Sequence, residues 1–208
     1  MTSPQAKKTK LSAAERRAQL LLVGRAVFAK YGYEATSMDE IAQDAGVSKP
    51  LIYEHFGGKE GLYAVIVDRE TEALIARIFG SISKGSPRAR WEGAVLAMMH
   101  YAAEQPDGFA VLTRDPPNGR PGRGITTVIG ETGDHLRSIF EQAFEHAGFE
   151  PTFSLLYAHA LIGMVVQATQ WWVENQDMPM EEAARHVAAI SWMGLRHLPK
   201  KPVLLSKQ

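Results

Sequence analysis

The segment between residues 37 and 56 constrains the fold most, because it predicts two short helices joined by a tight turn. Ser37-Met-Asp-Glu40 is a capping-box pattern, in which the serine hydroxyl accepts from a backbone N–H three residues on and the glutamate reaches back. Gly46 follows the first helix, at a position that favours a residue tolerating positive φ. Ser48 is a second N-cap candidate, and Pro50 falls in the first turn of the second helix. Two short helices joined by a glycine-containing turn form a helix-turn-helix.

The rest of the chain shows helical periodicity and no segment with the alternation of a strand, so the predicted fold class is all-α. A first helix is expected from the capping box Ser12-Ala-Ala-Glu15 to about Tyr31, with Gly32 closing it. A long helix from Lys59 to about Ile82 would span about 30 Å, enough to join two domains. Further helices are predicted at about 88–105, 125–146, 151–173 and 181–198, with a glycine- and proline-rich loop at 116–124.

These elements divide the 208 residues into a disordered basic arm (1–11), a helix-turn-helix domain (12–58) and a larger helical domain (59–208). The formal net charge is zero, but residues 1–30 carry seven lysines and arginines against one acid, Glu15. A basic segment ahead of a helix-turn-helix suits contact with phosphates. For the lysines at positions 7–10, the alternative is a solvated tail without a partner.

Composition and spacing argue against several other functions. The chain has no Cys, which excludes disulfides and Cys-ligated metals, and no two of its seven His stand three or four residues apart as a helical zinc pair requires. No strand precedes the glycines at 119–124, so they do not form a dinucleotide-binding loop. The N-terminal lysines are not followed by the apolar region of a signal peptide, and polar residues interrupt the apolar segment 151–173, which favours a buried helix over a membrane span. We therefore expect a cytoplasmic protein that is not an enzyme and needs neither a cofactor nor a membrane.

Several spaced elements in the N-terminal third resemble the DNA-binding domain of TetR-type regulators. They are Phe28-Ala-Lys-Tyr-Gly-Tyr33, Val47-Ser-Lys-Pro50, Tyr53-Glu-His-Phe56 and Lys59-Glu60. The sequence from Val47 to Asp68 is similar to that of an actinobacterial subgroup of these regulators. This subgroup includes a regulator of fatty-acid synthesis genes, and that regulator senses long-chain acyl-CoA. The resemblance implies a three-helix DNA-binding domain joined by the long helix to a ligand-binding and dimerisation domain. It also implies that the last two helices pair across a homodimer.

The residues that open the second short helix are the candidates for contact with bases, because the N-terminal residues of a recognition helix meet base edges. They are Ser48, Lys49, Pro50 and Leu51. Lys49 suits the O6 and N7 atoms of guanine, and Leu51 suits a thymine methyl group. For Lys49, a phosphate contact is the alternative.

Other residues are candidates for the phosphate backbone. Lys59 stands at the start of the long helix, where its charge and the free N–H groups both favour phosphate. The resemblance implies phosphate contacts for Tyr53 and His55, and for Thr36 and Ser37 at the start of the first short helix. For Tyr53, packing in the core is the alternative.

Large apolar side chains in the second domain are candidates for a ligand pocket, since Met and aromatic residues line adaptable sites. They are Trp91, Met98, Met99, Phe109, Leu112, Phe140, Trp171 and Trp172. For each one an ordinary core role is the alternative, and the resemblance favours a pocket for the set. The anionic head of an acyl-CoA would bind arginine, and the candidates are Arg114, Arg120 and Arg123, with a solvated loop as the alternative.

The predicted function is a ligand-responsive transcription regulator, acting as a repressor, that binds palindromic double-stranded DNA as a homodimer. Two recognition helices about one DNA turn apart would read the palindrome. A small hydrophobic effector, such as a long-chain acyl-CoA, would alter the DNA affinity. The alternatives are a helical small-molecule-binding protein that has lost DNA binding, and an α-helical enzyme, which would need a polar constellation that the sequence does not show.

Overall fold

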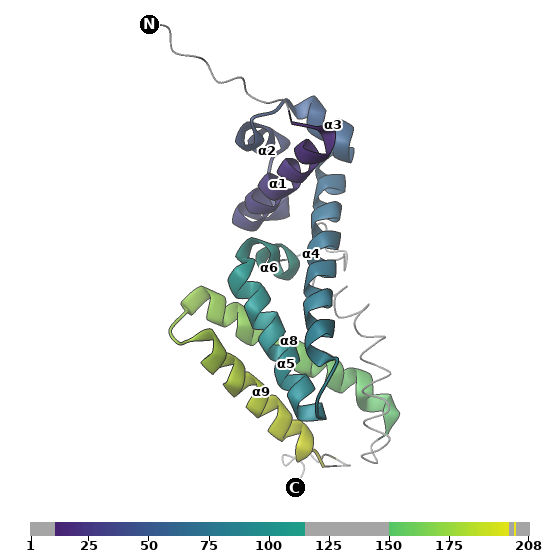
Figure 1. Ribbon diagram of the computed structural model, residues 1–208, viewed down its shortest axis with the longest axis vertical. Helices are drawn as coiled ribbons and strands as arrows, with labels where there is room; N and C mark the ends of the chain where they lie inside the picture. The colour runs from purple at the N-terminus through teal and green to yellow at the C-terminus, as the bar shows by residue number, and fades with distance from the viewer. Residues whose placement is uncertain (1–10, 115–149, 200–201, 203–208) are drawn as a thin grey trace, which may run out of the picture. The chain divides into compact units, whose positions relative to one another are not determined.

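The computed structural model describes residues 11–114, 150–199 and 202, and every regular element in these ranges is a helix (Figure 1). In chain order the helices are α1 (Ala13–Ala35), α2 (Met38–Ala45), α3 (Lys49–Phe56), α4 (Lys59–Ile82), α5 (Pro87–Glu104), α6 (Pro106–Thr113), the 3-10 turn η2 (Pro151–Phe153), α8 (Ser154–Asn175) and α9 (Met180–Arg196). The all-α prediction is confirmed. Residues 1–10 of the predicted arm at 1–11, the loop at 116–124 and the helix predicted at 125–146 lie outside the described residues. Along the described stretches, each helix is too short or too polar to cross a bilayer.

The chain divides into two compact units, Met1–Ile66 and Val67–Gln208, and α4 contributes residues to both. In the first unit α1 packs against α2, and α2 packs against α3. Its buried core includes Leu20, Phe28, Ile41, Ile52 and Leu62. At Gly24, α1 approaches the start of α4 so closely that an added Cβ would lie 3.1 Å from side-chain atoms of Leu62 and Ile66. The core therefore fixes the two short helices on α1 and the first turns of α4.

Both predicted capping boxes form. The hydroxyl oxygens of Ser12 and Ser37 accept from the N–H groups of Glu15 and Glu40, at 3.2 and 3.1 Å. In return each glutamate carboxylate accepts from the serine N–H at 2.8 Å. These hydrogen bonds from Ser12 and Ser37 lower the pKa of Glu15 and Glu40, because they favour the ionised carboxylate. Their contribution to stability is present at neutral pH and is lost as the pH falls through the lowered pKa values.

The turn residues follow the sequence prediction with one correction, at Gly32. Gly46 closes α2 in the left-handed region with φ 63°. Gly32 was expected to end the first helix, but it forms a kink with φ 79°, after which α1 continues to Ala35. Ser48 is the N-cap residue of α3, as predicted, but its hydroxyl makes no cap hydrogen bond. Its main-chain carbonyl accepts from the N–H of Leu51 at 3.1 Å.

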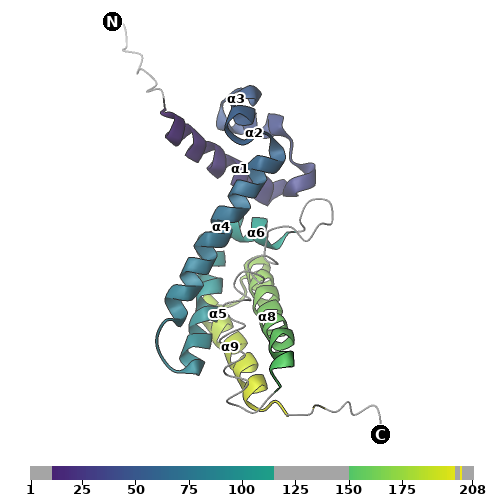
Figure 2. The same cartoon turned by 90° about the vertical axis from the view of Figure 1, so that its right-hand side faces the viewer.

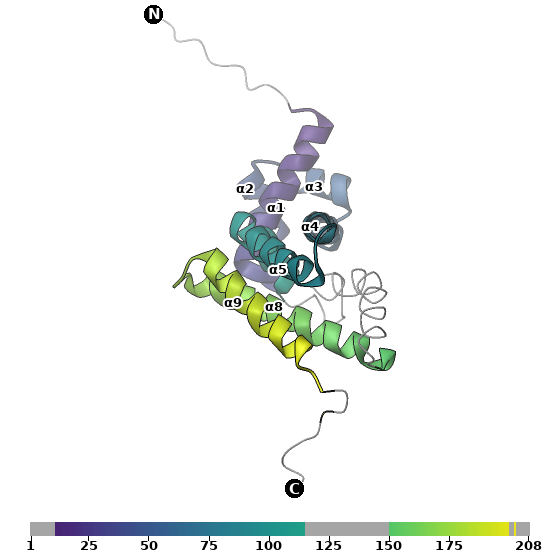
Figure 3. The same ribbon diagram turned by 60° about the horizontal axis from the view of Figure 1, so that its bottom comes forward.

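The second unit is built around α5, which packs against α6, α8 and α9; Figure 3 shows α5 lying alongside α9. Polar contacts between its helices include two hydrogen bonds from aromatic side chains. The Trp91 Nε1–H donates to Ser191 Oγ at 2.7 Å, and the buried Tyr101 hydroxyl donates to Glu70 Oε2 at 2.6 Å. Gly108 is also buried, and a Cβ at this position would clash with the Glu70 carboxylate and the Tyr101 hydroxyl. The contact between Glu70 and Tyr101 therefore requires the glycine.

Replacing Tyr101 by phenylalanine should lower the free energy of unfolding by about 2 kcal/mol, the range for a hydrogen bond to a charged group. The change keeps the ring and removes only the donor to the half-buried Glu70. Urea unfolding of both proteins measures the difference. Tyr31→Phe is the control, because Tyr31 is exposed, and an equal loss in the two variants would contradict the prediction.

Candidate nucleic-acid interface

The helix α3 lies beside α2 (Figure 2) and has one buried residue, Ile52, that anchors it in the core. Around this anchor Pro50, Tyr53 and Glu54 are exposed, and Lys49 is partly exposed. Tyr53 is 46% exposed, so the alternative of a core role for this residue does not fit the structure. The outward face of α3 therefore presents an ammonium group and a phenol hydroxyl.

Leu51 and His55 are half-buried on the same helix. The His55 ring lies against that of Phe56, with the ring centroids 6.1 Å apart. The Phe56 ring is in turn covered by the guanidinium of Arg17, 4.5 Å from its centroid. Each of these side chains is therefore partly buried in the first unit and partly exposed to solvent.

Lys49 is held by an acidic side chain from the preceding helix. Its Nζ donates to Asp39 Oδ2 at 2.9 Å. The hydrogen bond and the negative charge of Asp39 raise the pKa of Lys49, so the lysine remains an ammonium ion over a wide pH range. This contact was not predicted, because the sequence shows Asp39 only as part of the first turn of a helix.

Lys59 is positioned by the end of α1. Its Nζ donates to the Glu34 carbonyl oxygen at 3.1 Å and lies 4.5 Å from the centre of the Tyr33 ring. Tyr33 stacks on Phe28 and meets Tyr63 edge to face. Lys59 is thus a partly exposed cation on a fixed aromatic support, and sequence spacing gave no sign of this support.

The predicted DNA-binding residues next to α2 differ in their exposure to solvent. Thr36 is 3% exposed, and its hydroxyl donates to the Gly32 carbonyl at 2.7 Å, so its side chain is occupied inside the unit. Ser37 is exposed and caps α2, and Ser48 is exposed before α3. Of the nine predicted DNA-binding residues, Thr36 is the one that is buried.

Replacing Tyr53 by phenylalanine should weaken DNA binding by roughly 1 kcal/mol, equally for all sequences, if its hydroxyl holds a phosphate. The aromatic ring would stay, and only the hydroxyl would be lost. Fluorescence anisotropy on specific and unrelated duplexes at one salt concentration measures both affinities. Unchanged affinity, or a loss confined to one sequence, would exclude the phosphate role.

Four of the predicted ligand-binding residues lie together on the packed pair α5 and α6. These are Met98, Met99, Phe109 and Leu112, all buried. The three tryptophans have different environments. Trp91 is hydrogen-bonded to Ser191, and Trp171 is exposed. Trp172 is buried, and its Nε1–H donates to the Met178 carbonyl at 2.9 Å. Arg114 is exposed at the end of α6. Phe140, Arg120 and Arg123 lie outside the described residues.

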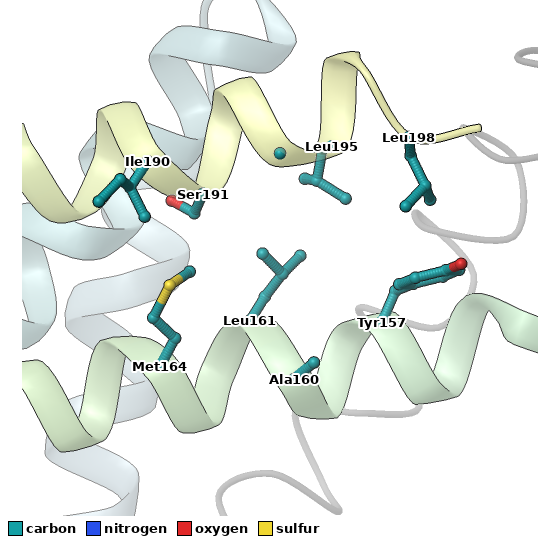
Figure 4. Close-up of a pocket in the computed structure, with 9 residues that line it drawn as sticks. Tyr157, Ala160, Leu161, Met164, Ile190, Ser191, Leu195 and Leu198 are labelled. Carbon is teal, nitrogen blue, oxygen red and sulfur yellow. The ribbon is translucent and has the colours of Figure 1, made fainter. Parts of the chain in front are cut away.

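A hollow of about 330 Å³ lies between α8 and α9 (Figure 4). Its lining is almost entirely apolar and comprises Tyr157, Ala160, Leu161, Met164, Ile190, Ser191, Gly194, Leu195 and Leu198. None of the predicted ligand-binding residues lines it. Apolar side chains are exposed on these two helices as well, including Leu156, Ile190 and Met193. Small residues such as Ala160 are the sequence signal for this surface, because they allow close approach of another helix.

A helix-turn-helix with an exposed recognition helix, followed by a helical second unit, defines the protein as a transcription regulator of the helix-turn-helix class. Residues 20–66 match the family model described as bacterial regulatory proteins, tetR family. This part of the chain is therefore similar to the DNA-binding domain of TetR-family regulators.

Similar proteins span most of the chain. The transcriptional activator FasR of Mycolicibacterium smegmatis is 29% identical over 188 residues, which cover 89% of this chain and 85% of FasR. A TetR-like regulator from Rhodococcus sp. RHA1 matches with a TM-score of 0.72 and 25% identity, over 90% of this chain and all of that one (100%). FadR from Bacillus subtilis, solved in complex with stearoyl-CoA, shares the fold with a TM-score of 0.69 at 18% identity, over 84% of this chain and 96% of that one.

Proposed function

We propose that the protein is a homodimeric regulator that binds palindromic operator DNA and changes its DNA affinity when a long-chain acyl-CoA binds. The observation that carries the DNA part is the outward face of α3, where Lys49 and Tyr53 project from a helix anchored by Ile52. Residues at the start of such a helix reach base edges, and those nearby hold phosphates. Acting on chromosomal DNA, the protein would work in the cytoplasm.

The apolar surface of α8 and α9 supports the dimer. Ile190 is 68% exposed and Leu156 is 61% exposed, and the hollow between the two helices has an apolar lining. Exposed apolar side chains gathered on two neighbouring helices suit an interaction site. A second copy related by a twofold axis would cover it and would give two recognition helices for the two halves of a palindrome.

The acyl-CoA part rests on the resemblance of residues 47–68 to an acyl-CoA-sensing subgroup and on the buried apolar residues of α5 and α6. The FadR structure with stearoyl-CoA supports it only to the extent that the same fold accommodates such a ligand. The ligand would act by binding one dimer conformation better than another, and DNA and ligand affinities would then be coupled reciprocally. Because α4 contributes residues to both units, it is the proposed route for this coupling. FasR is an activator by name, and the position of the operator decides whether this chain represses.

The test is fluorescence anisotropy with a duplex from the protein's own upstream region, and with duplexes selected from random DNA. Each is titrated at one stated salt concentration, with and without stearoyl-CoA, with stearate and free CoA as controls. A change in affinity with stearoyl-CoA alone supports the whole proposal. Tight binding that ignores stearoyl-CoA removes the ligand assignment and keeps the regulator. Failure to select any DNA removes operator binding and favours a small-molecule-binding protein.

A further inference from the structure

An acidic side chain stands in the surface that the proposed function assigns to DNA. The Asp39 side chain is 74% exposed and meets the ammonium of Lys49 at 2.9 Å. A carboxylate on this surface repels phosphates, so its presence needs an explanation. Asp39 lies in the first turn of α2, where an acid stabilises the helix dipole, but that role does not require contact with Lys49.

The contact changes what Lys49 can bind. An ammonium group has three donors, and one is used by Asp39, which leaves two for DNA. The major-groove edge of guanine presents two acceptors, O6 and N7. A phosphate group carries a full negative charge, and the adjacent carboxylate opposes it, whereas an uncharged base edge is not repelled in this way.

We propose that Asp39 is a positioning residue that directs Lys49 to a guanine and away from phosphate, and so sets the base preference of the recognition helix. The inference rests on the proposed binding of operator DNA. It also assigns Lys49 the base-reading role over the phosphate role that the sequence left open. The higher pKa of Lys49 agrees with this arrangement, since the ammonium must persist for both contacts.

If the ion pair of Asp39 and Lys49 had only a structural role, its loss would not change the base preference. Exposed ion pairs contribute little to folding, so loss of the pair should leave the melting temperature almost unchanged. Loss of a dipole contact would lower stability and leave base preference intact. Base preference is therefore the property that distinguishes a positioning role from a structural one.

The experiment starts from duplexes that the full-length wild-type protein selects from random DNA. Each base pair of one half-site is then changed in turn, and anisotropy gives the affinity ratio of the selected to the changed duplex. The Lys49→Met variant identifies the base pair that Lys49 reads. It is the base pair at which the affinity ratio falls close to one in this variant. The same scan is made with Asp39→Asn, with Asp39→Ala as a second variant, and with Asp44→Asn as the matched control. Asp44 is exposed on the same helix, and its change removes the same charge.

We expect the ratio at the guanine read by Lys49 to fall about tenfold in both Asp39 variants, within the range for one base contact. Affinity for unrelated DNA should rise in Asp39→Asn and in Asp44→Asn alike, because each loses a negative charge. In Asp44→Asn the ratio should stay at the wild-type value. An unchanged affinity ratio in the Asp39 variants overturns the inference. Equal weakening of binding to all duplexes in Lys49→Met overturns it as well. Operator binding stands in both cases. Failure of the wild-type protein to select DNA overturns the proposed function and the inference together.

Discussion

Replacing Gly61 by alanine should abolish operator binding and lower the free energy of unfolding by about 3 kcal/mol, the upper range for a side chain forced into filled space. The added Cβ would overlap the carbonyl oxygen of Phe56, the last residue of α3. A side chain could rotate away from such a contact, but a backbone atom cannot. The end of the recognition helix would have to move, and its outward residues would lose their register on DNA.

Urea unfolding and anisotropy on selected duplexes measure the two effects. Gly80→Ala is the matched control, because Gly80 is exposed on the same helix α4 and an added Cβ meets nothing within 4 Å. This control should keep DNA binding and gain up to about 1 kcal/mol, the usual advantage of alanine over glycine in a helix. If Gly61→Ala kept DNA binding and stability as Gly80→Ala does, the junction between α3 and α4 would tolerate a side chain. Overlap with the Phe56 carbonyl would then not explain the glycine at position 61.

Replacing Ile190 by arginine should convert the proposed dimer to monomers and reduce operator affinity at least a hundredfold. Ile190 lines the hollow between α8 and α9 and is largely exposed. At a twofold interface the substitution would bury an unpaired charge in each copy, which costs about 3 kcal/mol or more. A monomer has one recognition helix and loses the avidity of two half-sites.

Sedimentation velocity over a range of concentrations measures the oligomeric state. Ala189→Arg adds the same charge to the same helix at an exposed position that does not line the hollow, and this variant should remain dimeric. A wild-type protein that is monomeric at every concentration would refute the dimer directly. Dissociation in Ala189→Arg to the same extent would show that added charge, and not the position, is responsible.

The local features of the fold were predictable because they depend on residues close in sequence. The capping boxes at Ser12 and Ser37, the left-handed Gly46 and the apolar anchor Ile52 all follow from short-range rules. The extension of α1 beyond Gly32 was missed, since glycine permits a kink as readily as an end, and contacts made after the kink decide between them.

The candidate site was harder to predict because its geometry comes from contacts between helices. Lys49 was recognised from its position, but its contact with Asp39, ten residues earlier, depends on how α2 and α3 pack. The support of Lys59 by Tyr33 likewise depends on where α1 ends. In the second unit, composition identified large apolar residues without separating Met99, which is buried, from Trp171, which is 46% exposed. Both have side chains suited to a core and to a pocket, so composition alone cannot assign them.

The glycine pair after α3 also limits how the protein can be redesigned for another DNA sequence. Gly57 and Gly58 have φ values of 74° and 141°, which side-chain-bearing residues rarely adopt. A recognition helix grafted from another regulator would keep its angle only if the graft stopped at Phe56 and left this pair in place. New specificities are therefore best sought by varying the exposed positions of α3, with Ile52 and the two glycines left as a constant frame.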